Sequence, residues 1–295
     1  MTEPVAGVAQ AMKTMAGDGN HDYLFAIYEQ LRAERGPIRA LDFGCGPGKL
    51  ITRARERGFD DFLGAEKDWG DEAIDPKTMP SIPADTANRI VRVADDGKLP
   101  FPDQHFDFVC SNEVFEHVHN LGPVLDELAR VTKPDGVHVH LFPTREIVIE
   151  GHLEVPLYHR LPARWRERYV RWFYERGIAA WSDQTASFDE WWGHLGPFMR
   201  DEVFHRPWTE FEAAFRRHFE VRRREQDKLL FHLGQRRSKP FRMAARVFSS
   251  LPAWLASVME LRRVGATVEL RLIRPFVGRI GPGGLVTCGQ LVDGR

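Results

Sequence analysis

The chain has 295 residues, of which 43% are hydrophobic and 28% are charged, with a formal net charge of −1. A chain of this length buries a sizeable core, either as one large domain or as one domain with a long insertion. The balanced charge gives no overall attraction for nucleic acid, and no recognition motif is present, so we expect no nucleic-acid partner.

The N-terminal part of the chain is expected to begin with a loose lead over residues 1–20. Apolar side chains at helical spacing between Tyr23 and Leu31 then predict a helix, which Gly36 ends. The chain enters its first strand after this helix.

A glycine-rich loop follows an apolar run over residues 38–43. Its three glycines, Gly44, Gly46 and Gly48, have the spacing Gly-x-Gly-x-Gly, and helix-forming residues come next. This order predicts a strand, a tight turn in which glycine reaches positive φ and lets the backbone approach a ligand, and a helix. A dinucleotide-binding turn has its third glycine one residue later, so the spacing disfavours a nicotinamide dehydrogenase.

Strands and helices alternate after the loop. We expect a second strand over 62–66, a third over 90–96, a fourth over 106–111, a helix over 125–131, a turn over 133–136 and a fifth strand over 137–142. This alternation predicts a parallel sheet with right-handed crossovers. Ligands of such sheets lie outside the carboxyl ends of the strands, where the acidic residues of this segment fall.

The composition changes after Pro143. Residues 145–206 contain many arginines and five of the eight tryptophans, and we expect a helical insertion that covers the ligand site. The tryptophans are expected to build the core of the insertion, with stacking on a flat or sugar-like substrate as the alternative.

The remaining segment, 207–274, is expected to complete the sheet. It should contain a helix over 208–215, a sixth strand from Phe219 to about Leu230 and a seventh strand over 267–273, where polar and apolar residues alternate. Residues 240–262 have a helical pattern, and we assign no role to the tail, 275–295.

The order of these motifs carries a family resemblance. The run Leu41-Asp42-Phe43-Gly44-Cys45-Gly46-Pro47-Gly48, a second strand that ends in Glu66, and the segment Phe106–Val118 resemble the small-molecule, type 11 branch of the class I S-adenosylmethionine (AdoMet)-dependent methyltransferases. The resemblance covers residues 21–144. It implies an α/β, Rossmann-like fold with a seven-stranded, mostly parallel sheet, helices on both faces and a helical lid insertion after strand 5.

The resemblance also implies AdoMet as the cofactor. Asp42 would hold the methionine end, and Glu66 would accept hydrogen bonds from two ribose hydroxyls. Asp95 would accept the adenine amino group, in a register that Asp96 leaves uncertain by one residue. The full set of expected cofactor-binding residues is Asp42, Gly44, Cys45, Gly46, Gly48, Glu66, Lys67, Asp95, Asp96 and Asn112. The alternatives are a plain strand-turn-helix and solvated acids at strand ends.

A general base accelerates methyl transfer to an alcohol, typically by ~10²–10⁴-fold. His152 and His159 come just beyond the fifth strand, where a lid belongs, and imidazole accepts protons near neutral pH. We expect His152 as the base and His159 as the second candidate, with a structural role as the alternative for each. His138 and His140 share one face of the fifth strand and are expected to be buried and hydrogen-bonded.

We therefore expect a methyltransferase that acts on a small molecule, at a hydroxyl of a sugar, a lipid-linked acceptor or a secondary metabolite. An N- or C-methyltransferase is one alternative. Another is a non-catalytic binding module that keeps the fold and docks a partner or a membrane. Residues 240–262 combine arginines with apolar side chains, which predicts either peripheral contact with an anionic membrane or packing on the sheet.

The cysteines and the N-terminus bear on the compartment. Cys45, Cys110 and Cys288 have no metal-ligand spacing, so we expect neither a metal site nor a disulfide framework. The first 20 residues lack a signal-peptide pattern, and no uncharged apolar run reaches the roughly 18 residues of a membrane span. We expect a cytoplasmic protein, and the oligomeric state stays open.

Overall fold

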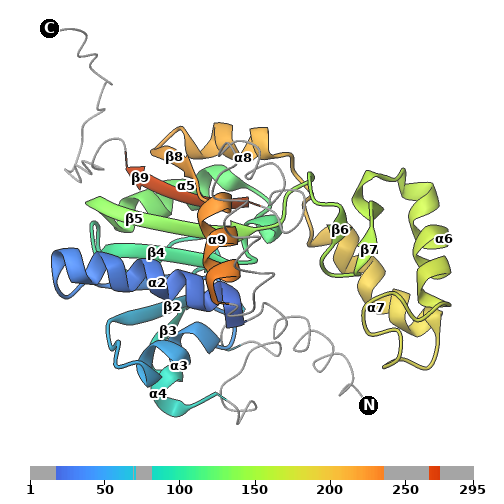
Figure 1. The fold of residues 1–295 in the computed structure, drawn as a ribbon, viewed down its shortest axis with the longest axis horizontal. Helices are drawn as coiled ribbons and strands as arrows, with labels where there is room; N and C mark the ends of the chain where they lie inside the picture. The colour runs from blue at the N-terminus through green and yellow to red at the C-terminus, as the bar shows by residue number, and fades with distance from the viewer. Residues whose placement is uncertain (1–17, 69, 71–81, 236–265, 273–295) are drawn as a thin grey trace, which may run out of the picture.

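A seven-stranded sheet forms the centre of the molecule. The computed structural model describes residues 18–68, 70, 82–235 and 266–272. In these ranges the strand order is β3-β2-β1-β4-β5-β9-β8 (Figure 1). The strands are β1 (Ala40–Phe43), β2 (Phe62–Glu66), β3 (Ile90–Arg92), β4 (Phe106–Asn112), β5 (Thr132–Phe142), β8 (Phe219–Arg223) and β9 (Ala266–Leu272).

The sheet is mostly parallel, as the alternation of strands and helices predicts. The pairs β1–β2, β1–β4, β2–β3 and β4–β5 are parallel, whereas β9 is antiparallel to both of its neighbours, β5 and β8. The central strands β1 and β4 are mostly buried, as expected for parallel strands that helices cover on each face. The seventh strand that is predicted over 267–273 is confirmed as β9, and the structure places it antiparallel beside the fifth.

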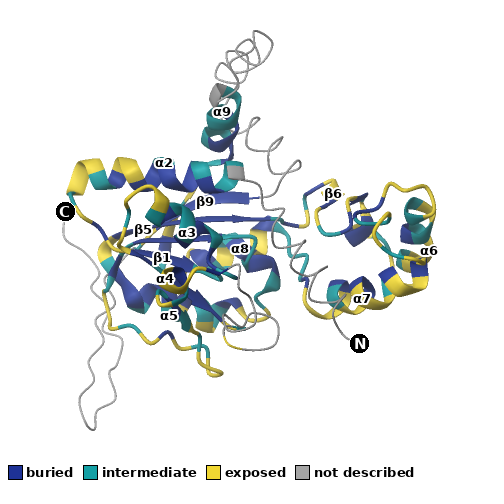
Figure 2. Ribbon diagram, turned by 90° about the horizontal axis from the view of Figure 1, so that it is seen from below, coloured by how far each residue is buried: buried dark blue, intermediate teal, exposed yellow. Residues whose placement is uncertain are grey.

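Helices cover both faces of the sheet. On one face, α5 (Leu121–Val131) and α8 (Trp208–Phe215) pack against β4, β5 and β9 in a cluster that includes Val109, Phe142 and Phe215. On the other face, α2 (Asp18–Arg35) and α3 (Lys49–Glu56) pack against Phe62 and Phe108. Val109 and Phe108 serve opposite faces because side chains alternate along a strand. Figure 2 shows the strands buried between helices whose outer faces are exposed.

The insertion, residues 145–206, lies beyond the ends of the strands of the sheet (Figure 1). It contains a small antiparallel pair, β6 (Ile149–Glu150) and β7 (Val155–Pro156), a short 3₁₀ helix η2 (Tyr158–Arg160), α6 (Ala163–Tyr174) and α7 (Phe188–Asp201). Its own core includes Val170, Leu195 and Trp191, whose indole N–H donates to the Ala180 carbonyl at 2.8 Å. Trp165 and Trp172 on α6 are each 49% exposed, so only part of the tryptophan set builds this core.

Three local predictions are wrong, and one of them is the third strand, which is expected over 90–96 but ends at Arg92. The sixth strand ends at Arg223, and Glu225–Gln235 forms the helix α9, where the sequence predicts strand up to Leu230. Tertiary packing decides this segment, because α9 lies against α2 and Phe231 contacts Tyr23 with ring centroids 5.5 Å apart. The turn expected over 133–136 lies within β5, which starts at Thr132 and shifts register against β4.

Other expected segments lie outside the described residues. These are most of the loose lead, the amphipathic segment 240–262 with its proposed membrane contact, and the tail 275–295. The third strand ends at Arg92, so Asp95 and Asp96 belong to the loop that follows it. No helix in the described part of the chain has the length and apolar character of a membrane span.

His138 and His140 lie inside the sheet, as predicted, in a buried chain of hydrogen bonds. The Thr132 hydroxyl lies 2.8 Å from His138 Nε2, His138 Nδ1 lies 3.3 Å from His140 Nε2, and His140 Nδ1 lies 2.8 Å from the Ser111 hydroxyl. Both rings are fully buried. Burial lowers the pKa of His138 to about 3, and burial with the neighbouring His138 holds that of His140 well below its usual value.

These two histidines are expected to make the protein sensitive to acid. In the unfolded chain both take up protons below about pH 6.5, whereas the folded protein keeps them neutral. The free energy of unfolding should therefore fall as the pH drops below about 6.5, by up to about 1.4 kcal/mol per pH unit for each histidine. Urea unfolding from about pH 7 to pH 5 measures this slope. A His138→Gln variant should have a shallower slope, and equal slopes would contradict the assignment.

Candidate cofactor and acceptor site

The glycine loop lies at the carboxyl end of β1 and is tied to β2. The N–H groups of Gly44 and Cys45 donate to the Ala65 carbonyl at 2.8 and 3.3 Å, and the Gly46 N–H donates to Glu66 Oε2 at 2.7 Å. Gly44, Gly46 and Gly48 all have positive φ, at 72°, 52° and 78°. These are backbone conformations that glycine adopts without the steric cost of a Cβ atom.

Gly48 has a packing role as well as a conformational one. It is the N-cap of α3, and a Cβ atom there would lie 2.7 Å from both Ile90 Cδ1 and Thr86 Cγ2. Gly48 therefore lets the first turn of α3 approach β3 and α4 (Ala84–Ala87).

Two buried acids lie beside the loop. Asp42 lies one residue before the end of β1 with 4% exposure, and Glu66 ends β2 with 8% exposure. Burial, and then the negative charge of Glu66, raise the pKa of the Asp42 carboxyl to about 8. Glu66 is held by the Gly46 N–H and by the Asp68 N–H, which donates to Oε1 at 3.3 Å. A cation brought to Asp42 would relieve this electrostatic cost.

The other expected cofactor residues lie around the same opening. The side-chain oxygen of Asn112, at the end of β4, accepts from the Asn20 amide at 2.8 Å. Asp96 accepts from the Lys98 N–H at 3.1 Å and so shapes its own turn, whereas the Asp95 side chain is fully exposed. Lys67 is exposed at the end of β2.

One cavity of about 2220 Å³ brings these groups together. It lies at the carboxyl ends of the strands, and its wall extends to the start of α2, to α9 and to α7 of the insertion. The expected cofactor residues in the wall are Asp42, Gly44, Cys45, Gly46, Glu66, Lys67, Asp95, Asp96 and Asn112. Gly48 lies behind the wall.

His152 is in the wall of this cavity, opposite the sheet. Its Nδ1 lies 2.7 Å from Glu150 Oε1, and Glu150 Oε2 accepts the N–H groups of His152 and Leu153 at 3.0 and 2.8 Å. Burial lowers the pKa of His152, but the Glu150 carboxylate outweighs burial and holds that pKa above its usual value. The opposite charge of His152 likewise holds the pKa of buried Glu150 below its usual value, against the effect of burial.

His159, the second candidate base, does not reach the cavity wall. Its Nε2 lies 3.0 Å from the Arg145 carbonyl, and its ring stacks on His205 with centroids 5.0 Å apart. Burial and the neighbouring His205 lower the pKa of His159 to about 4. The structure thus brings His152, and not His159, together with the glycine loop.

Glu116 and His117 join His152 in a group that sequence spacing did not reveal. Both lie in the 3₁₀ helix η1 (Phe115–His117) after β4, about 35 residues before His152 in the chain. Ligand-type atoms of the three residues lie within 4.8 Å of one another. The sequence signals were Glu-x-x-Glu-His over 113–117 and Glu-x-His over 150–152, but only the fold places them face to face.

Comparison with known proteins identifies the family. A family model described as a methyltransferase domain matches residues 18–203. An uncharacterized methyltransferase from Mycobacterium sp. (strain JLS) is 36% identical over 138 residues, which are 46% of this chain and 51% of the relative. The mitochondrial ubiquinone biosynthesis O-methyltransferase of Dictyostelium discoideum is 32% identical over 112 residues, 34% of this chain and 33% of the relative.

The match to solved structures is broader and more distant. The S-adenosylmethionine-dependent methyltransferase from Mesorhizobium loti is 17% identical, covers 83% of this chain and 96% of its own, and has a TM-score of 0.44. The chain spans about half the length of the three mycobacterial relatives, 51% of each, and a third of the Dictyostelium one.

The sheet order, with β9 antiparallel between β5 and β8, and the glycine loop after β1 define a class I methyltransferase fold. The chain belongs to the methyltransferase-domain family, and its cofactor is AdoMet.

The residues of the cavity fit this cofactor. The buried Asp42 carboxyl would lose its proton beside the cationic methionine end and so become its negative partner, and Glu66 presents a carboxylate that suits vicinal hydroxyls. A Cβ atom at Gly44 would meet Val114 Cγ2 at 2.5 Å, so the glycine lets the loop pack closely on Val114, another residue of the cavity wall.

Gly44→Ala is expected to destabilise the protein more than a matched change at Gly58. Both glycines have positive φ, 72° and 76°, which costs an L-residue about 1–2 kcal/mol. Nothing lies within 4 Å of a Cβ atom at Gly58, whereas the Cβ atom at Gly44 clashes with Val114. Overpacking adds about 1–3 kcal/mol.

Urea unfolding of the two variants measures the difference. A Gly44→Ala/Val114→Ala double variant should be less affected by the clash than Gly44→Ala alone. Equal losses for Gly44→Ala and Gly58→Ala would refute the close contact.

Proposed function

We propose that this protein transfers the methyl group of AdoMet to a hydroxyl group of a small molecule, with His152 as the general base. The observation that carries the proposal is the His152 ring, held by buried Glu150, in the wall of the cavity that also contains the glycine loop. A histidine positioned by a carboxylate is a common arrangement for accepting a proton from a hydroxyl.

Bound AdoMet supplies a methyl group on a sulfonium sulfur, which is already activated for transfer to an aligned nucleophile. Asp42 and Asn112 would hold its methionine part, Glu66 its ribose, and Lys67 and Asp95 the adenine side, with Gly44, Cys45 and Gly46 lining it through their backbone. These assignments follow the family resemblance and agree with the places of the residues in the cavity wall.

The chain's own part in the chemistry is to orient the acceptor and to take its proton. The Glu150 carboxylate accepts the proton of His152 Nδ1, because a carboxylate with a lowered pKa has none to donate. The lone pair of the neutral ring is then on Nε2, where it can accept the hydroxyl proton. The insertion would limit the access of water, because Leu195 and Phe198 of α7 belong to the cavity wall.

An oxygen acceptor is favoured by this histidine, since a nitrogen, sulfur or carbanion nucleophile has less need of a base. The name of the ubiquinone biosynthesis O-methyltransferase adds support from a relative that matches a third of the chain. Within this class, we propose a sugar, lipid-linked or secondary-metabolite hydroxyl as the acceptor.

Glu66→Gln is expected to weaken AdoMet binding. The amide can still accept the Gly46 N–H but loses the charge and one acceptor oxygen, and a hydrogen bond to a charged group contributes about 1.5–3 kcal/mol. This predicts an affinity about 10–100-fold lower. Thermal melting with AdoMet, S-adenosylhomocysteine and NAD measures it, because a ligand at 100 times its Kd stabilises the folded state by about 2.7 kcal/mol.

Glu29→Gln is the matched control, because Glu29 is an exposed acid on the outside of α2. It should melt and bind as the wild type does. An equal shift with NAD, or no shift with AdoMet and S-adenosylhomocysteine, would overturn the cofactor assignment.

His152→Ala is expected to lower kcat by about 10²–10⁴-fold on a hydroxyl acceptor. The wild-type rate should rise with pH as His152 loses its proton, at a pKa above about 6.5. In Glu150→Gln that rise should move to lower pH, because the carboxylate that raises the pKa of His152 is gone. Initial rates of S-adenosylhomocysteine formation across pH measure both effects.

The control is His218→Ala, because His218 pairs with Asp126 at 2.7 Å in another histidine–carboxylate pair that does not line the cavity. Its rate and pH profile should match those of the wild type. An unchanged rate in His152→Ala, or an unchanged profile in Glu150→Gln, would exclude His152 as the base.

A further inference from the structure

The carboxylate of Glu116 is buried where η1 meets the insertion, behind the cavity-lining residue His117. Glu116 is 1% exposed, and neither of its oxygens accepts a hydrogen bond of normal length and angle from the described residues, although the Glu113 carboxyl interacts with it closely. A buried carboxylate without a donor is costly, and native proteins resolve that cost with a partner or an ion. Burial, and then the negative charge of the neighbouring Glu113, hold the pKa of the Glu116 carboxyl well above its usual value.

His117 presents a ring nitrogen to this carboxylate. Its Nδ1 lies 2.7 Å from the Glu202 carbonyl at the end of α7. A carbonyl only accepts, so Nδ1 carries the proton and Nε2 carries the lone pair of the neutral ring. That Nε2 lies 3.8 Å from Glu116 Oε1.

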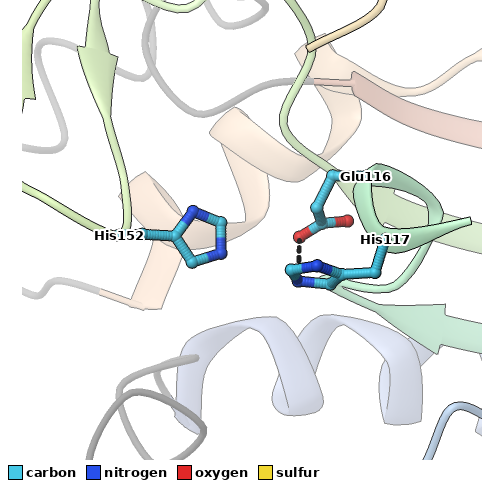
Figure 3. A group of neighbouring side chains, drawn as sticks. All are labelled: Glu116, His117 and His152. Atoms are coloured by element: carbon cyan, nitrogen blue, oxygen red, sulfur yellow. Dashed lines mark ion pairs between the residues drawn. The ribbon is translucent and has the colours of Figure 1, made fainter. Parts of the chain in front are cut away.

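His152 presents its ring in the same way from the opposite side. Its Nδ1 donates to Glu150, which leaves the lone pair of the neutral ring on Nε2. Figure 3 shows the His152 ring facing Glu116 and His117 across a gap, with the three side chains coming from two separate segments. Phe198 of α7 packs against both rings, with centroids 5.6 Å from His117 and 5.4 Å from His152.

We propose that Glu116, His117 and His152 bind a divalent transition-metal ion of the zinc type in the wall of the cofactor cavity. The ligand atoms of the three residues lie within 4.8 Å of one another. Zinc ligands lie about 2.0–2.2 Å from the ion, so small side-chain rotations close the set.

The donor set and its support match this kind of ion. Two imidazoles and one carboxylate are a ligand set of catalytic zinc sites, which keep a further position for water or substrate. A metal-binding histidine usually donates its other N–H to a carboxylate or a backbone carbonyl, and here His152 donates to Glu150 and His117 to the Glu202 carbonyl. A bound ion would take the place of the proton that the raised pKa of Glu116 favours, and so stabilise its carboxylate form.

The position of the metal site suggests that the ion activates the acceptor hydroxyl. This role rests on the proposed hydroxyl methylation, whereas the proposal that the ion binds does not. His117 and His152 both line the cavity, so an ion held by them would be accessible to an acceptor bound there. A coordinated hydroxyl loses its proton to water more readily, since a bound divalent ion lowers the pKa of an oxygen ligand. With the ion bound, His152 is a ligand; without it, His152 acts as the base.

Metal binding is tested on the full chain after treatment with a chelator. Co²⁺ is titrated in while its visible ligand-field bands are recorded, and bound Zn²⁺ is measured by mass spectrometry after dialysis. We expect one equivalent of either metal per chain. Glu150 only orients the ligand His152, so Glu150→Gln should weaken metal binding by about 10–100-fold, as is typical for loss of a residue that supports a ligand. Glu116→Gln and His117→Gln each remove a ligand and should weaken metal binding by more than this.

His218→Gln is the matched control and should bind metal as the wild type does. Melting of each variant without metal, and its shift with AdoMet, show that it is folded and keeps the cofactor site. Less than one equivalent in the wild type, or binding that Glu116→Gln and His117→Gln leave unchanged, would overturn the metal site.

The same samples separate this inference from the proposed function. Methyl transfer to a hydroxyl that survives chelation, in a protein that takes up no Co²⁺, would support His152 as the base and overturn the metal site. Stoichiometric Co²⁺ binding in a protein that methylates no hydroxyl acceptor would leave the metal site standing and overturn the proposed function.

Discussion

The contact on which the site depends is the hydrogen bond from the Gly46 N–H to the Glu66 carboxylate, at 2.7 Å. It joins the turn after β1 to the end of β2, so Glu66 both fixes the shape of the glycine loop and lines the cavity. Because parallel strands end at the same edge of the sheet, this contact also places Asp42 and Asn112 beside the loop. The other expected cofactor residues of the cavity wall lie around this contact.

The insertion supplies the other half of the cavity, and the two halves meet at η1. The Glu202 carbonyl of α7 holds His117, and Phe198 packs on His117 and His152 together. Glu150 is fixed by two backbone N–H groups, so it orients the His152 ring rigidly. Buried acids and two oriented imidazoles in one wall are groups that can handle protons or an ion, whereas the sheet side offers groups that hold a cofactor.

The errors of sequence reasoning share one physical origin. Residues 225–235 have enough apolar content to read as a strand, but they form α9 because α2 offers an apolar face to pack on. Residues 133–136, which are predicted as a turn, instead belong to β5, at the place where this strand shifts register against β4. Local pattern cannot resolve such cases, since packing against a distant element outweighs the small difference in local propensity.

The sequence by itself determined which segments become β1 to β5, where the glycine loop lies, and which acids and amide stand at or just after the ends of β1 to β4. Each of these features depends on neighbours within a few residues. The sequence also pointed to His152 through its place beyond the fifth strand. Only the tertiary structure decided that His159 turns away to Arg145, that α9 replaces the end of a strand, and that Glu116 and His117 face His152. Contacts between segments far apart in the chain depend on how the insertion packs against the sheet, and a single sequence carries no local signal of that packing.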